Sequence, residues 1–130
     1  MIVARGGRVM ADADVVADLL NGRGEWERVA ELIRGRRLVL STVAAFEVWC
    51  GLRTRRAQDA FRKLLRGVRL HPLDALTAAR AAEIHRVLEE RGTRIAQRDA
   101  LIAGACLATG LPLITRNRRH FERVSGLQLV

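Results

Sequence analysis

Short apolar runs alternate with longer stretches of helical spacing along the whole chain. The apolar runs contain mainly Val, Leu and Ile with few polar positions, which is typical of strands covered on both sides. They lie at residues 9–11, 38–40, 68–70 and 113–114, and residues 127–130 form a plausible last strand. Alternation of such strands with helices predicts a single α/β/α sandwich with a central, mostly parallel sheet over residues 1–130.

Helices are predicted between these strands from apolar positions three and four residues apart. Their expected ranges are 14–21, 25–34, 42–52, 58–65, 77–91 and 97–109. In the second helix Trp26, Val29 and Ile33 are expected to face inward. Ser41 or Thr42 is expected to cap the third helix.

Four acidic residues interrupt apolar segments. Asp12 and Asp14 follow the first strand, Glu47 is the only charge in residues 38–52, and Asp99 precedes a charge-free stretch at 100–115. Carboxylates are rarely buried unless they are paired or bind a metal. Because the carboxyl ends of parallel strands share one edge of a sheet, these side chains are expected to converge there.

Asn117 follows the strand at 113–114 and is expected at the same edge. Oxygen ligands of this kind suit Mg²⁺ or Mn²⁺, which activates water for attack on phosphate esters. Asp14 has two interpretations, as a further metal ligand or as the N-cap of the first helix.

The charge balance points to an anionic partner. The formal net charge is +9, and all basic residues except Lys63 are arginines. Such a balance is typical of proteins that bind nucleic acid or an acidic protein, although charged helix faces give the same composition. Arg116, Arg118 and Arg119 stand beside the expected acidic pocket, either for phosphate contact or as a solvated loop.

The two cysteines, Cys50 and Cys106, lie in apolar segments without metal-ligand spacing. They are expected to be small core residues in a reducing compartment. The sequence shows neither a signal-peptide pattern nor an apolar run of membrane-spanning length. A cytoplasmic protein without a membrane segment is therefore expected.

Three segments together resemble the PIN-domain ribonucleases, specifically the VapC-type toxins of type II toxin–antitoxin pairs. They are VMADADVVADLLNG, LVLSTVAAFEVWCGL and IAQRDALIAGACLATGLPLITRNRRHFERVSGLQLV. The resemblance implies that Asp12, Glu47 and Asp99 are acidic metal ligands and that Asn117 lies in the loop of the fourth polar position. It also implies Mg²⁺ or Mn²⁺ as cofactor, RNA as substrate, a homodimer, and neutralisation by a small antitoxin. Because the charge of the acidic pocket attracts a cation, an arginine or aromatic residue of such an antitoxin is expected near the pocket.

The chain departs from the family pattern at a few positions. Ala13 and Asp14 stand where relatives often have Thr and Asn, and Gln97 stands where some have an acid. Asn117 and His120 replace an acid that many relatives carry, which leaves less charge for a second metal ion.

The sequence leaves two alternatives to a metal-dependent ribonuclease. A PIN-fold module with a degraded metal site would bind RNA or a protein without cutting. The Asp12-Ala13-Asp14 sequence also matches the D-x-D motif of dehalogenase-type phosphatases, but those enzymes need a larger chain and a catalytic lysine, which Lys63 is not placed to supply.

Overall fold

The computed structural model describes residues 7–130. Along the chain its elements are β1 (Val9–Ala11), α1 (Ala13–Asn21), α2 (Trp26–Arg34), β2 (Leu38–Ser41), α3 (Thr42–Gly51), α4 (Arg55–Leu65), β3 (Arg69–His71), α5 (Ala75–Glu90), α6 (Gln97–Thr109), β4 (Leu113–Ile114) and α7 (Arg118–Phe121). Residues 1–6, from which the absence of a signal peptide was partly inferred, lie outside the described residues.

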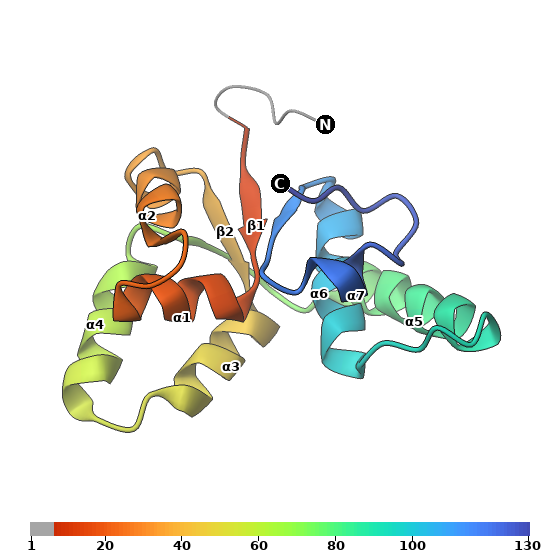
Figure 1. Ribbon diagram of the computed structural model, residues 1–130, viewed down its shortest axis with the longest axis horizontal. Coiled ribbons are helices and arrows are strands. Elements are labelled where there is room, and N and C mark those ends of the chain that lie inside the picture. The colour runs from red at the N-terminus through yellow and green to blue at the C-terminus, as the bar shows by residue number, and fades with distance from the viewer. Residues whose placement is uncertain (1–6) are drawn as a thin grey trace.

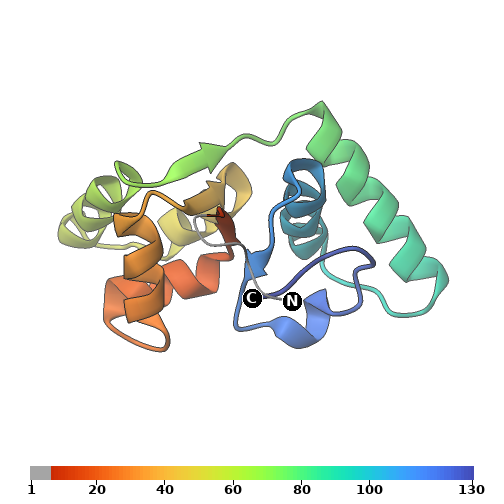
Figure 2. The same cartoon turned by 90° about the horizontal axis from the view of Figure 1, so that it is seen from above.

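The strands form one parallel sheet in the order β3-β2-β1-β4. Helices α1, α2 and α4 lie on one side of the strands, and α5 and α6 lie on the other (Figures 1 and 2). The predicted α/β/α sandwich with a parallel sheet is therefore confirmed. The core lies on both faces of β1, β2 and β4, whose side chains are buried, whereas β3 at the edge is largely exposed.

Three sequence predictions about the core were wrong. Trp26 is 39% exposed, and α2 instead buries Leu32 together with Val29, which was expected to face inward. Cys50 is exposed near the end of α3, whereas Cys106 is buried as expected. Residues 127–130 form only an isolated parallel bridge, Leu113 to Leu129, because the short β4 offers little edge for pairing.

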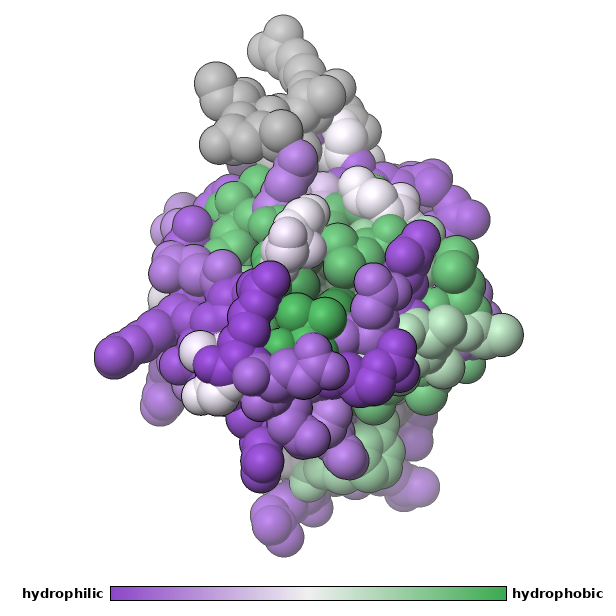
Figure 3. All heavy atoms as spheres, turned by 90° about the vertical axis from the view of Figure 1, so that its right-hand side faces the viewer, coloured by the Kyte–Doolittle hydropathy of each residue, from purple (hydrophilic) through white to green (hydrophobic). Residues whose placement is uncertain are grey.

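Figure 3 shows the face of the molecule on the side of α5. Most of this face is hydrophilic, with apolar residues near its centre and along one margin. Within residues 7–130, no helix has both the length and the apolar composition that a membrane crossing needs.

Helices α5 and α6 cross closely at Gly104. A Cβ atom added at Gly104 would lie 2.8 Å from both the Cβ and the backbone nitrogen of Ala81. The missing side chain thus sets the distance between the two helices, and with it the position of α6.

We expect Gly104→Ala to lower the free energy of unfolding by about 1–3 kcal/mol, because the added methyl group forces backbone apart in a packed core. Gly51→Ala is the matched control, since no atom lies within 4 Å of a Cβ added there. That change should be neutral or stabilise by up to about 1 kcal/mol. Urea denaturation of both variants measures the difference, and equal effects would contradict the close crossing.

Candidate active site

Asp12 is held at the carboxyl end of β1 by two hydrogen bonds. One carboxylate oxygen accepts from the backbone N–H of Ala13 at 2.8 Å, and the other accepts from the hydroxyl of Thr115 at 2.8 Å. Thr115 is adjacent because β1 pairs with β4, with Ala11 opposite Ile114. Asp12 is only 3% exposed, so its orientation is fixed by the sheet.

Asp14 lies in the first turn of α1 but does not cap the helix, because Asp12 has that position. The N-cap interpretation of Asp14 was therefore wrong. Its Oδ2 accepts from the backbone N–H of Arg116 at 3.1 Å, while the Arg116 Nε lies 2.9 Å from Asp18 on α1. The loop after β4 is thus attached to α1 through both acids.

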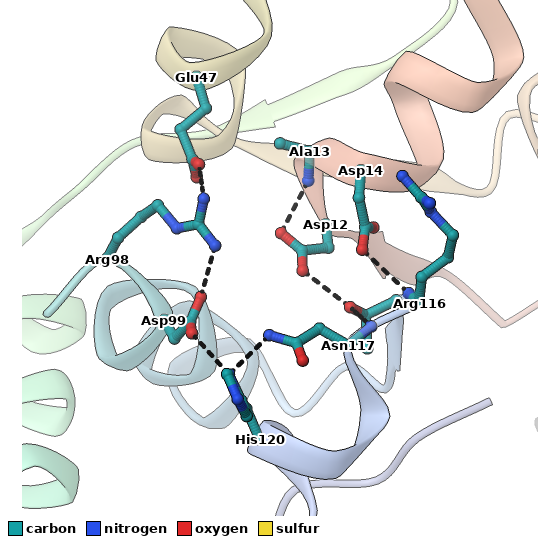
Figure 4. A network of polar contacts seen from close by, with 10 residues as sticks. Asp12, Ala13, Asp14, Glu47, Arg98, Asp99, Arg116, Asn117 and His120 are labelled. Atoms are coloured by element: carbon teal, nitrogen blue, oxygen red, sulfur yellow. Dashed lines mark hydrogen bonds and ion pairs between the residues drawn. The ribbon is translucent and has the colours of Figure 1, made fainter. Parts of the chain in front are cut away.

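Glu47 on α3 and Asp99 on α6 are joined by Arg98. The guanidinium donates to Glu47 through one terminal nitrogen and to Asp99 Oδ1 through the other, at 2.9 Å in the second case (Figure 4). Glu47 is brought here because Ser41 caps α3 directly after β2, as expected. Sequence reasoning missed Arg98, whose only signal was its place beside Asp99.

Asn117 is linked to the site by hydrogen bonds to Thr115 and His120. Its backbone N–H donates to the Thr115 hydroxyl at 3.0 Å, and its side-chain amide donates to His120 Nδ1 at 2.8 Å. The same His120 nitrogen lies 3.7 Å from Asp99 Oδ2. Figure 4 shows Asn117 and His120 on the opposite side of Asp99 from Arg98.

The predicted RNA-contacting arginines are exposed beside this network. Arg116 is paired with Asp18, and Arg118 donates to the backbone carbonyl of Val130 at 3.1 Å. Arg119 is exposed in the first turn of α7. They stand at the rim of the site rather than among its carboxylates.

Burial and the neighbouring negative charges raise the pKa values of Asp12, Asp14 and Glu47. Burial raises the pKa of Asp12, and the negative charge of Asp99 raises it further. Burial and the charge of Asp12 raise the pKa of Asp14. Burial also raises the pKa of Glu47, against the lowering effect of Arg98. Ionising all of them in the absence of another cation is therefore costly.

The oxygen donors fit a hard divalent cation. Asp14 Oδ1 and Glu47 Oε1 are buried without a hydrogen-bond partner, and carboxylate oxygens are the ligands that Mg²⁺ prefers. However, nowhere in residues 7–130 do three or more His, Cys, Asp and Glu side chains lie close enough together to hold a metal ion. The guanidinium of Arg98 lies between Glu47 and Asp99 and is paired with both carboxylates.

A family model of the PIN domain matches residues 9–127. The chain belongs to the PIN-domain family. The resemblance expected from the sequence is confirmed, and it covers nearly the whole chain.

This PIN domain is similar to two proteins described as tRNA(fMet)-specific endonuclease VapC. The protein from Salmonella typhimurium is 26% identical over 126 residues, which cover 94% of this chain and 96% of the relative. The protein from Shigella flexneri is 38% identical over 55 residues, or 42% of each chain.

Solved structures share the fold of this PIN domain. VapBC2 from Rickettsia felis bound to a promoter DNA fragment has a TM-score of 0.83 at 20% identity, with 94% of this chain and 96% of that chain covered. DNA-bound VapBC from Salmonella typhimurium has a TM-score of 0.83 at 23% identity, with 95% and 97% covered.

We expect Asp12→Asn to stabilise the metal-free protein near neutral pH. A carboxyl group whose pKa is raised by folding ionises first in the unfolded chain, so stability is lost as pH rises from the ordinary value of 3.8 through the raised pKa. Asparagine cannot ionise and so lacks this loss, and its Oδ1 can still accept from the backbone N–H of Ala13, whereas its Nδ2 would have to donate to the Thr115 hydroxyl. The gain should be absent near pH 3 and largest at pH 7, where the Asp12 carboxyl group of the unfolded chain is fully ionised.

Urea denaturation in EDTA across this pH range measures the effect. A stability difference between Asp12→Asn and the parent protein that does not change with pH would show that burial of Asp12 does not govern its ionisation.

Proposed function

We propose that the protein is a metal-dependent endoribonuclease that acts as the toxin of a type II toxin–antitoxin pair. The observation that carries this proposal is the convergence of four acids from three segments at one edge of the sheet, in a PIN-family chain of net charge +9. An acidic pocket on a basic protein suits a divalent cation together with a polyanion.

In this proposal Asp12, Glu47 and Asp99 hold Mg²⁺ or Mn²⁺ and are the catalytic acids, with Asp14 as a further ligand. A divalent cation in such a site polarises a phosphodiester and favours ionisation of the attacking water. Thr115 fixes the direction of the Asp12 carboxylate through its hydroxyl. Asn117 has an amide oxygen that can orient water beside Asp99.

RNA binding is proposed for the exposed rim. Arg116, Arg118 and Arg119 extend from the loop after β4 and from α7, close to the carboxylates. Arginine forms forked hydrogen bonds with phosphate oxygens, so these side chains can hold the RNA backbone beside the carboxylates. The endonuclease relatives act on a transfer RNA by their descriptions, which makes transfer RNA the first substrate to test.

An antitoxin is proposed to occupy the groove between α1, α3 and α4. This groove has a volume of about 590 Å³. Ala17, Leu20 and Leu52 supply apolar lining, and Asp14, Glu47 and Arg98 lie at its acidic end. The solved relatives with the same fold are described as VapBC pairs, which supports a protein partner of this kind. An arginine or aromatic residue of that partner is expected at the acidic end.

A homodimer is proposed through an exposed apolar patch made of Phe46, Leu73 and Leu76. Phe46 is 66% exposed, Leu73 47% and Leu76 52%. They lie on neighbouring elements, because the backbone N–H of Leu73 donates to the hydroxyl of Thr42, one turn before Phe46 on α3. Exposed large apolar groups gathered in this way are typical of protein interfaces.

The cytoplasm is the proposed location. Both Cys50 and Cys106 are free thiols, which is usual in a reducing compartment.

A second candidate function is a PIN-fold module that binds RNA or a protein without cutting RNA. Two observations favour it, namely the occupation of Glu47 and Asp99 by Arg98 and the amide of Asn117 in place of an acid.

We expect the purified protein to cut total RNA and transfer RNA in the presence of Mg²⁺ or Mn²⁺. Cleavage should stop when EDTA removes the metal ion. Asp99→Asn should slow cutting by at least about a hundredfold, because it removes a proposed metal ligand. Asp59→Asn on α4 removes the same charge from an exposed aspartate paired with Arg62 and should retain activity. Gel analysis of the RNA measures each rate, and a folded protein that never cuts would support the binding module.

We expect Phe46→Asp to convert a dimer to a monomer, because a charge placed in an apolar interface must lose its hydration. Trp26→Ser, which changes another exposed aromatic residue on α2, should leave the dimer intact. Sedimentation velocity gives the mass of each variant. A monomeric parent protein would contradict the homodimer.

A further inference from the structure

Arg98 already acts as a counter-ion to the acidic residues. One terminal nitrogen pairs with Glu47 on α3, 51 positions away in sequence, and the other pairs with the adjacent residue Asp99 on α6 (Figure 4). Burial lowers the pKa of Arg98, but the contacts with Asp99 and Glu47 outweigh that effect and raise it. The guanidinium thus remains protonated and places a positive charge where the two acids converge.

A divalent cation shared by Glu47 and Asp99 would need the space that the guanidinium fills. Mg²⁺ contacts its oxygen ligands at about 2.1 Å, closer than the nitrogen of a hydrogen-bond donor can approach, so it cannot share the position of the guanidinium. Both cations would also repel each other at this distance. Occupation by Arg98 and by a metal ion bridging these two acids is therefore mutually exclusive.

Arg98 is able to leave without disturbing the core. Its side chain is 49% exposed, whereas the side chains of Glu47 and Asp99 are 16% and 3% exposed. Arg98 also lies at the edge of the groove between α1, α3 and α4, so its long side chain can turn into that open space. Arg98 is therefore much more accessible to solvent than either acid.

We propose that Arg98 is a built-in competitor for the metal site, which a divalent cation must displace before Glu47 and Asp99 can hold it. This residue then sets the cation concentration at which the site fills. The inference rests on the proposed function, since it assumes that the carboxylates bind a divalent cation. It adds a positioning residue that acts through the acids rather than on the RNA.

The test is direct binding of Mn²⁺ alone, measured by calorimetry and by electron paramagnetic resonance of the free ion. If the guanidinium occupies the acids nine-tenths of the time, its removal tightens binding about tenfold. We therefore expect Arg98→Gln to lower the Kd for Mn²⁺ by about tenfold or more. Arg53→Gln is the matched control, because Arg53 lines the same groove and this variant loses the same charge.

Thermal unfolding supplies a second readout that does not depend on RNA cleavage. In EDTA, Arg98→Gln should unfold at a lower temperature than the parent, because Glu47 and Asp99 lose their counter-ion. Saturating Mn²⁺ should then raise the midpoint more in Arg98→Gln than in the parent, since a ligand that binds only the folded state stabilises it according to its affinity.

The outcomes separate this inference from the proposed function. Tighter Mn²⁺ binding by Arg98→Gln, but not by Arg53→Gln, supports the proposal that Arg98 competes with the metal ion. Equal or weaker binding by Arg98→Gln overturns it and leaves the metal site in place. Equal tightening by Arg53→Gln also overturns it, because overall charge would then be the cause. If neither the parent nor folded Arg98→Gln binds Mn²⁺, the proposed metal-dependent function fails, and the competitor fails with it.

Discussion

The parallel pairing of β1 with β4 is the constraint on which the site depends. Because Ala11 lies opposite Ile114, the next residues along both strands, Asp12 and Thr115, meet at the same edge. β1 also pairs with β2, so the helix that follows β2 starts at that edge and carries Glu47 toward it. A shift of register in either pair would separate these side chains.

Concentrating acids at one edge has an electrostatic cost that the fold offsets locally. Asp12 caps α1, and Asp14 and Asp99 lie in the first turns of α1 and α6, where backbone N–H groups and the helix dipole favour negative charge. Arg98 supplies the remaining positive charge to Glu47 and Asp99. The folded protein therefore tolerates the cluster, although one carboxylate oxygen of Asp14 and one of Glu47 have no hydrogen-bond partner.

The charges are divided between the pocket and its surroundings. Asp12 follows β1 and the other acids lie on α1, α3 and α6, whereas arginines stand on the exposed loop after β4 and on α7. This division suits a mechanism in which the pocket holds a cation and the rim holds an anionic chain. It also suits a partner that enters the groove between α1, α3 and α4 and meets the acids at its end.

The sequence alone determined the alternation of strands and helices and the position of Asp12 directly after the first strand, because these follow from local apolar patterns. It did not determine that Asp12 caps α1, that Trp26 and Cys50 are exposed, or that residues 127–130 make only one bridge. Nor did it indicate that Arg98 joins Glu47 to Asp99. Those features depend on how far α2 reaches over the sheet, how long β4 is, and how closely α3 approaches α6. Tertiary packing decides these features. The long side chain of Arg98, for example, contacts a residue far away in the sequence, which the spacing of neighbouring residues does not indicate.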